Sequence, residues 1–424
     1  MKSPSHPERR TVFVLGAGFS CRAGFPLQPQ LLRRAVDLGV MDIPAGAPDS
    51  FLEDQATALE FLRRVFARGG DRDLREVFES GQGPTLEDVF TLLDQTIARR
   101  SFCGGYSWSR LSEVREALNR VVLFPIHAAH EAVSSNAAEP YRQFAALLLE
   151  QRMAGGLASE VVSVVSLNWD CLLEDSIYWC IRRLGGPQCV DVDYCCYTTP
   201  LTPLCPHTPS LTQRASGLVN LKVMKLHGSA NWLLCPNCNR LFTGLGAEED
   251  EWRLYVTPRP CPVCSTLWLN REDPRGDQHP RLEPFFVTPT YVKVFDNPHI
   301  RMTWHNAYTT LAAADEVVFI GYSLPEADYH VRTLLRRAVS PDAEITVVLI
   351  EDDRPKRNTP KYLRRHFPSS RYQAFFGSRR PAFTFGGAKA YFEAVFAGSR
   401  LSRQLARVRR LAARNRRAAA KAGP

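Results

Sequence analysis

Five short apolar runs, each ending in a polar or glycine-containing motif, constrain the fold of this 424-residue chain most strongly. The runs are Thr11–Leu15, Val161–Leu167, Val219–Leu226, Val317–Ile320 and Ile345–Ile350. Helical segments such as Ala327–Ala338 separate them, and this alternation predicts an α/β fold with a parallel sheet covered on both faces. Ligands of such sheets bind beyond the carboxyl ends of the strands, where the polar motifs fall.

The segments between these runs predict the domain organisation. Apolar residues recur at helical spacing over residues 51–150, and Glu87 and Asp88 mark the first turn of one helix, so we expect a helical insertion there. A further helix is expected from about Pro29 through Leu31–Leu38. Residues 230–284 hold two cysteine pairs and many prolines, which predicts a small module. We expect one domain over residues 1–398, followed by a basic helical or disordered tail over 399–424.

Composition and charge exclude some classes of protein. The chain is 45% hydrophobic and 23% charged, and it has no apolar run of membrane-spanning length and no apolar leader before the first strand. We therefore expect a cytoplasmic protein with no membrane partner. The net charge is +9, but Arg400 to Lys421 contains nine basic residues and no acidic one, so the body is close to neutral. The tail could contact nucleic acid non-specifically, bind an acidic partner or remain solvated.

The twelve cysteines indicate a metal site. Two Cys-x-x-Cys pairs, separated by 22 residues, suit tetrahedral zinc and would leave the metal no open position. The four expected ligands are Cys235, Cys238, Cys261 and Cys264. A second group, near His207, could form another metal site or consist of free thiols; its members are Cys189, Cys195, Cys196 and Cys205.

Three motifs at strand ends could carry chemistry. Gly16–Ser20 (G-A-G-F-S) could admit a pyrophosphate near a helix N-terminus, although Cys21 replaces the third glycine of a dinucleotide fingerprint and a plain strand–helix turn is the alternative. Asn168 and Asp170 could bind a carboxamide and a ribose hydroxyl, or could simply form a turn. His227 could accept a proton from a ribose hydroxyl or a water, or could bond to a loop carbonyl.

In order, these motifs resemble the sirtuin family. The resemblance rests on Gly16–Ser20 with Ala23–Pro26, Asn168–Asp170, Leu226–Gly228, the four knuckle cysteines and Gly321–Leu324, and it spans roughly residues 11–355. It implies a Rossmann-like NAD domain, a zinc module and cleavage of the nicotinamide–ribose bond. His227 would act as base, Asn168 would position a ribose hydroxyl or water, and Asp170 would hold the carboxamide. The implied dinucleotide-binding residues are Gly16, Ala17, Gly18, Ser20, Pro26, Gly321, Ser323 and Glu351.

The sequence departs from protein-deacylating sirtuins in two segments, and both bear on which molecule accepts the ADP-ribose group. Where protein deacylases have D-F-R, Pro26 is followed by Leu27–Gln30 (L-Q-P-Q), and the deacylase F-G-E segment is replaced by Pro284–Lys293. The latter segment and Thr85–Phe90 are similar to bacterial sirtuin-like proteins associated with phage defence, in which water is the acceptor. The resemblance therefore implies an NAD glycohydrolase that yields nicotinamide and ADP-ribose, with activity controlled by a protein partner or by homo-oligomerisation. The alternatives are an NAD-dependent protein-lysine deacylase and a non-enzymatic sensor of NAD or ADP-ribose, or a nucleic-acid-binding partner.

Overall fold

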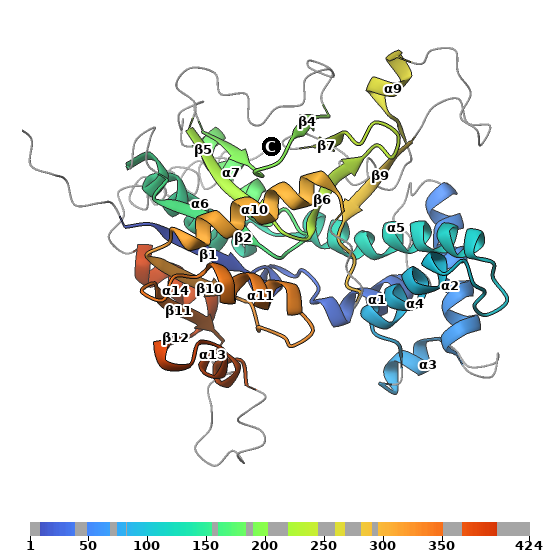
Figure 1. The fold of residues 1–424 in the computed structure, drawn as a ribbon, viewed down its shortest axis with the longest axis horizontal. Coiled ribbons are helices and arrows are strands. Elements are labelled where there is room, and N and C mark those ends of the chain that lie inside the picture. Colours follow the sequence, from blue (N-terminus) through green and yellow to red (C-terminus); the bar gives the residue numbers. More distant parts are fainter. Residues whose placement is uncertain are drawn as a thin grey trace, which may run out of the picture.

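The chain folds into two sheets surrounded by helices (Figure 1). The structure is a computed structural model, and it describes residues 9–38, 49–67, 74–81, 83–154, 160–183, 190–201, 219–244, 259–267, 281–290, 296–350 and 367–396. Glu351, Cys189, Cys205, His207 and the tail at 399–424 lie outside the described residues. None of the described helices is long and apolar enough to span a membrane.

The larger sheet has seven strands in the order β12-β11-β10-β1-β2-β5-β3, and every neighbouring pair is parallel. Its strands are β1 (Thr11–Leu15), β2 (Val162–Ser166), β3 (Val190–Asp193), β5 (Val219–Lys225), β10 (Glu316–Ile320), β11 (Glu344–Leu349) and β12 (Ala382–Phe385). This confirms the predicted α/β class and its five strands. The sequence did not reveal β3 and β12, the two edge strands, because each has only four residues and neither forms a long apolar run.

The register places the carboxyl ends of the five inner strands at one edge of the sheet. Leu15 pairs with Ile320 on one side and with Ser166 on the other. Ser166 pairs with Lys225, and Ile320 pairs with Val348. The chain leaves β1 toward β2 and later returns to β10 on the opposite side of β1, which makes β1 the point where the strand order reverses. Such a reversal opens a crevice at the carboxyl edge.

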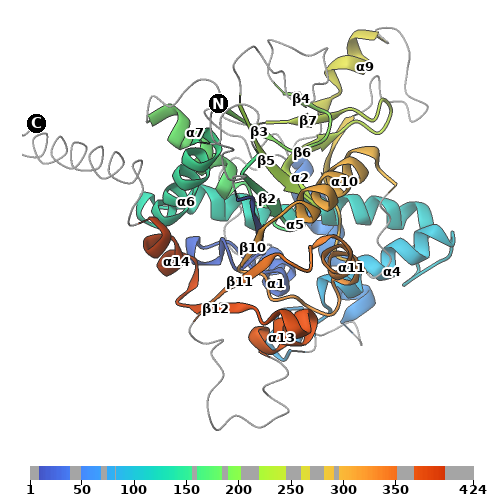
Figure 2. The ribbon, with the colours of Figure 1, turned by 60° about the vertical axis from the view of Figure 1, so that its left-hand side comes forward.

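Helices cover both faces of this sheet, as Figure 2 shows. Phe13 and Leu15 of β1 point to one core and Val12 and Val14 to the other, as the alternation of a strand requires. The first face carries α6 (Ser135–Ala154), α7 (Leu172–Arg183) and α14 (Gly387–Phe396). The second face carries α10 (Pro298–Ala312), α11 (Tyr329–Ala338) and α13 (Pro368–Phe376).

A group of helices stands at one end of the sheet (Figure 1). It contains α1 (Gln28–Leu38), α2 (Asp49–Phe66), α3 (Leu74–Glu79), α4 (Leu86–Ala98) and α5 (Trp108–Ala132). Arg120 of α5 binds Asp54 of α2 through Nε and Nη2, at 2.5 and 2.7 Å. Helices α2 to α5 fall in the segment predicted as a helical insertion, whereas α6, at its end, packs against α7 and the sheet.

The smaller sheet has the order β4-β7-β6-β9-β8 and carries the four knuckle cysteines. Its elements are β4 (Thr198–Pro200), β6 (Gly228–Leu234), β7 (Leu241–Thr243), β8 (Arg259–Pro260) and β9 (Arg281–Phe286), with α9 (Pro262–Leu267) beside them. β6 begins three residues after β5 ends, so the segment around His227 joins the two sheets.

Candidate active site

A cavity of about 730 Å³ runs along the carboxyl edge of the large sheet. Residues at or just beyond the ends of five neighbouring strands line it: His227 after β5, Asn168 after β2, Gly16 after β1, Gly321 after β10 and Leu349 of β11. Because neighbouring strands lie about 4.8 Å apart, these ends span roughly 19 Å. The cavity therefore suits an elongated ligand, and its volume falls in the range of small-molecule and cofactor sites.

The glycine loop after β1 packs against the loop after β10. The Gly18 N–H donates to the Gly321 carbonyl at 2.9 Å, and the Gly16 N–H donates to the Ile320 carbonyl at 3.0 Å. A Cβ on Gly16 would lie 2.6 Å from the Tyr322 Cα, and one on Gly321 would lie 2.0 Å from the Phe19 N. Any side chain at Gly16 or Gly321 would therefore prevent the close contact between the two loops.

The loop leads from a strand to a helix, as the sequence predicted. A 3₁₀ turn, Cys21–Ala23, follows the loop, and α1 begins at Gln28, one residue before the predicted start near Pro29. The Gly16 and Gly18 N–H groups are bonded to the neighbouring loop, so these two donors are not available to a ligand. Gly16, Ala17, Gly18 and Pro26 nevertheless line the cavity.

Ser20 lies behind the cavity wall and joins two of the expected site residues. It is fully buried, it donates to Asp170 Oδ2 at 2.6 Å, and it accepts from Asn168 Nδ2 at 3.2 Å. Asp170 Oδ1 accepts from the Leu172 N–H at 3.2 Å, at the start of α7. Both carboxylate oxygens thus hold protein groups, which corresponds to the turn-forming alternative, although Asp170 also lines the cavity. Ser20 therefore orients Asn168 and Asp170 and, contrary to the expectation, is not among the residues that line the cavity.

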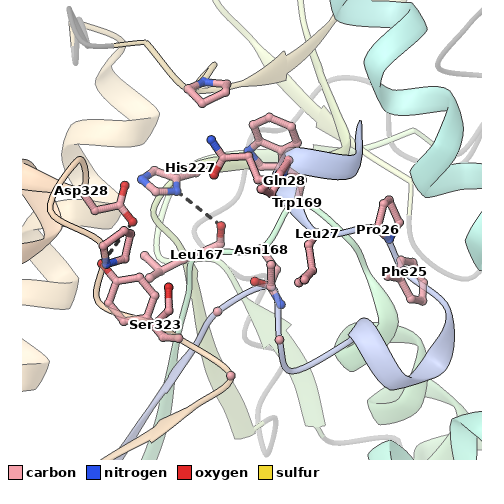
Figure 3. A pocket seen from close by; sticks show the side chains of 18 of the residues that line it. Phe25, Pro26, Leu27, Gln28, Leu167, Asn168, Trp169, His227, Ser323 and Asp328 are labelled. Carbon is pink, nitrogen blue, oxygen red and sulfur yellow. Dashed lines mark hydrogen bonds between the residues drawn. The ribbon is translucent and has the colours of Figure 1, made fainter. Parts of the chain in front are cut away.

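Asn168 has an acceptor atom available for a ligand. Only 6% of the residue is exposed, and its Nδ2 is held by Ser20. Its Oδ1 is buried and has no hydrogen-bond partner among the described residues, while the residue lines the cavity (Figure 3). A buried amide oxygen without a partner is costly, and a ligand hydroxyl would satisfy it.

His227 lies on the same part of the cavity wall. Its Nδ1 is 3.4 Å from the Leu167 carbonyl oxygen (Figure 3). Since a carbonyl only accepts, the neutral ring carries its proton on Nδ1, and Nε2 is its basic nitrogen. The main chain is also fixed, because the His227 carbonyl accepts from the Val287 N–H at 2.8 Å and the Leu226 carbonyl accepts from Trp304 Nε1 at 2.9 Å.

A buried ion pair supports the loop that carries Asn168 and Asp170. Lys225 is fully buried; its Nζ donates to the Asp170 main-chain oxygen at 2.5 Å and lies 3.0 Å from Glu174 Oε1. Burial acts to lower the pKa of Lys225, but the surrounding negative groups, Glu174 first, outweigh it and raise that pKa. The cationic lysine therefore fastens the end of β5 to the start of α7.

The loop after β10 forms a further part of the cavity wall. Ser323 and Asp328 line the cavity (Figure 3). The Tyr322 hydroxyl donates to Asp328 at 3.1 Å, and the Tyr322 carbonyl accepts from the Tyr372 hydroxyl at 2.9 Å. Of the other expected residues, Gly321 lines the cavity, whereas the expected contact of Glu351 lies outside the described residues.

The four knuckle cysteines come together as predicted. Their sulfur atoms lie within 4.8 Å of one another, with Cys235 Sγ 3.7 Å from Cys264 Sγ and Cys238 Sγ 3.8 Å from Cys261 Sγ. A tetrahedral zinc with bonds of about 2.3 Å requires sulfur atoms about 3.8 Å apart, so the arrangement fits the ion. Four sulfurs fill every position of such an ion. These cysteines are also absent from the cavity lining, which separates the metal centre from His227.

The described members of the second cysteine group behave as buried thiols. Burial raises the pKa of Cys196 to about 12 and that of Cys195 well above its ordinary value. Among the described residues, the four knuckle cysteines are the one group with metal-ligand geometry. Cys195 and Cys196 therefore favour the free-thiol alternative.

Comparisons with known proteins return Sir2 structures. No family model matches the sequence, and no curated protein matches it. A solved structure from work on the mechanism and regulation of Sir2 enzymes is 12% identical, with a TM-score of 0.34, over 96% of this chain and 94% of that one. A Sir2 homologue in complex with ADP-ribose is 12% identical, with a TM-score of 0.36, over 93% and 92%. A Sir2 mutant with a peptide and NAD is 14% identical, with a TM-score of 0.26, over 80% and 81%.

The architecture is the one that the sirtuin resemblance implies, a Rossmann-like parallel sheet with a four-cysteine module.

Several residues that line or support the cavity were not predicted from the sequence. Gln28 counted only as a departure from a motif and Glu87 only as a helix-start signal, whereas both line the cavity. Lys225 immediately precedes the Leu-His-Gly segment, and its position at the end of a buried strand was the available signal. Asp328 and Arg371 carried none, because they reach the cavity only through the tertiary fold.

Proposed function

We propose that this chain binds NAD along the carboxyl edge of the large sheet and hydrolyses the bond between nicotinamide and ribose. The observation that carries the proposal is the cavity across five strand ends, with Asn168 and His227 on the wall at its β2–β5 end. A dinucleotide has two nucleosides joined by a pyrophosphate. The central glycine loops would face the pyrophosphate, and the β11 end would hold the adenosine.

The residues at the β2–β5 end suit the chemistry of a glycosidic bond. Cleavage develops positive charge on the ribose, and nicotinamide leaves with the bonding electron pair. Asn168 Oδ1 would accept a hydrogen bond from a ribose hydroxyl or the water, and His227 would accept a proton as the acceptor attacks. Asp170, held by Ser20 and the Leu172 N–H, would present its remaining lone pairs to the carboxamide.

The segment beside His227 favours water over an acyl-lysine peptide as acceptor. A peptide that adds as a strand needs main-chain N–H groups on the strand that receives it. Here Pro284 and Pro289 have no N–H, and the Val287 N–H already binds the His227 carbonyl. This segment offers few donors for an added strand, which supports hydrolysis over deacylation.

The test is product identification with purified protein and NAD. We expect nicotinamide and ADP-ribose in equal amounts, and the same products after an acetyl-lysine peptide is added. O-acetyl-ADP-ribose formed only with that peptide would favour the deacylase. Binding of NAD or ADP-ribose without turnover, under every activating condition tried, would favour a sensor.

The zinc centre would serve the fold and not the reaction. Zinc, when bound, would supply a structural cross-link between the Cys235–Cys238 and Cys261–Cys264 knuckles. Cys235, Cys261 and Cys264 are buried together with Leu233, Phe242 and Leu282, so the ion would close a small core of its own.

We also propose a role in defence against phage, with activity held low until a partner or self-association releases it. This rests on the resemblance of Pro284–Lys293 and Thr85–Phe90 to defence proteins. Cellular NAD should fall after infection in cells carrying the wild-type chain and remain constant with Asn168→Ala.

For the tail, deletion of residues 399–424 should abolish any binding of nucleic acid that weakens with salt; equal binding by the truncated chain would contradict this.

A further inference from the structure

Two helix starts bring a glutamine and a glutamate into the cavity wall. Gln28 is the first residue of α1, and Glu87 lies in the first turn of α4. Both line the cavity, and Gln28 Nε2 donates a hydrogen bond to Glu87 Oε1. The helical insertion thus contributes a carboxylate to a cavity that otherwise lies along the sheet.

Glu87 is well held. Thr85 caps α4 by accepting from the Asp88 N–H at 3.1 Å, and Asp88 Oδ2 accepts from the Thr85 N–H at 3.0 Å. This reciprocal capping box fixes the first turn, and the helix dipole favours a negative charge there. Glu87 therefore projects from a fixed helix turn on the insertion side of the cavity.

The carboxylate determines which way the Gln28 amide faces. A carboxylate has only acceptor atoms, so the amide must present its Nε2 hydrogens to Glu87. Oε1 then faces away from Glu87. The Gln28 side chain reaches from the start of α1 toward the part of the cavity that His227 and Trp169 line (Figure 3). The pair thereby places a hydrogen-bond acceptor of fixed orientation in that part of the cavity.

We propose that Gln28 is a positioning residue for the water that attacks the ribose, and that Glu87 sets the direction of its amide. The inference rests on the proposed function and deepens it by assigning the acceptor. The water donates one hydrogen to Gln28 Oε1 and turns a lone pair toward the ribose carbon. The new carbon–oxygen bond forms as the carbon–nitrogen bond breaks, neutral nicotinamide leaves with the electron pair, and the excess proton of the water passes to His227 and then to solvent.

The test uses methanol as a competing acceptor. Purified enzyme is given NAD in dilute methanol, and the ratio of ADP-ribose to methyl-ADP-ribose is measured for the wild type and for Gln28→Leu. Leucine offers no acceptor to water but contacts a methyl group well. We expect the ratio to fall about five-fold, the factor of one net hydrogen bond, with the KM for NAD little changed. A residue with a merely structural role would lower both products together and leave the ratio constant.

Two further variants complete the experiment. Gln373→Leu makes the same change at an exposed side chain of α13 that does not line the cavity, and it should keep the wild-type ratio. Glu87→Gln preserves size but lets the Gln28 amide turn, so the ratio should fall about two-fold, and this variant decides the matter if Gln28→Leu does not fold. A wild-type product ratio in Gln28→Leu would overturn the inference but leave the proposed hydrolysis standing. If Gln28→Leu does not fold, a wild-type ratio in Glu87→Gln has the same meaning. Absence of NAD cleavage by the activated wild type overturns both.

Discussion

His227 is the side chain to which we assign proton transfer, and its replacement tests that role. His227→Ala should lower kcat for NAD cleavage by about 100-fold or more, the usual contribution of a general base, while NAD binding changes little. His305→Ala, at an exposed histidine, is the matched control and should keep full activity. Initial rates over a range of NAD concentrations separate the two effects. Equal kcat for His227→Ala and wild type would remove His227 from the mechanism.

Lys225 and Glu174 form a buried ion pair, and removing only one partner should destabilise the fold more than removing both. Lys225→Met alone leaves the Glu174 carboxylate buried without its cation, so we expect a loss of about 3–5 kcal/mol in the free energy of unfolding. The double variant Lys225→Met with Glu174→Leu should recover much of that loss. Denaturant unfolding measures both. If the double variant were less stable than the single one, the pair would not be the reason for the loss.

His127 should make stability depend on pH. Burial, assisted by the nearby His130, lowers the pKa of His127 to about 3 in the folded chain. In the unfolded chain the same histidine takes up a proton near pH 6.5. The free energy of unfolding is therefore unaffected by this group above pH 6.5, and it decreases as the pH drops from 6.5 toward 3. The slope should be about 1.4 kcal/mol per pH unit. His127→Gln should flatten the unfolding free energy over this window; an unchanged slope would contradict the assignment.

At the scale of elements, the cysteine knuckles should depend on metal. Elemental analysis should find one zinc per chain, and Cys261→Ser should lose the zinc and lower the thermal midpoint. Cys103→Ser, which alters a half-buried thiol outside the cluster, should retain both the metal and the midpoint. A Cys261→Ser protein with wild-type zinc content would show that the metal is held elsewhere.

The sequence predicted the elements whose pattern is local. Val161–Leu167 is a run of valine and leucine interrupted only by Ser163 and Ser166, and β2 occupies Val162–Ser166 within it. Strand β3, Val190–Asp193, alternates valine with aspartate over four residues and lacks such a signal. The smaller sheet was also missed, because most of its strand pairs join distant parts of the sequence, as Gly228 does with Phe286 and Thr198 with Leu241.

The site residues, too, could be predicted only where their signal is local in the sequence. Asn168, Asp170 and His227 could be predicted because each follows a recognisable strand, and the parallel register brings such ends together. The role of Gly16 and Gly18 could not, since their close approach to Gly321 and Tyr322 depends on β10 pairing with β1. Gln28 and Glu87 meet only because α1 packs against α4.

At the scale of the whole molecule, the cavity connects parts of the chain that are far apart in sequence. Its wall includes Gln28 and Glu87 from the helices at the end of the sheet, His227 from the junction of the two sheets, and Arg371 from α13. A ligand that fills it would contact all of these parts. We therefore expect NAD to raise the thermal midpoint of the whole chain by favouring the folded state.

The most direct test is a crystal structure of Asn168→Ala with NAD, a variant chosen because it should bind without cleaving. We predict the nicotinamide ribose beside His227, the pyrophosphate at the Gly16–Gly18 and Gly321 loops, and the adenosine near β11 and α13. NAD in the opposite orientation, or bound outside this cavity, would contradict the proposed reaction and the residue roles together.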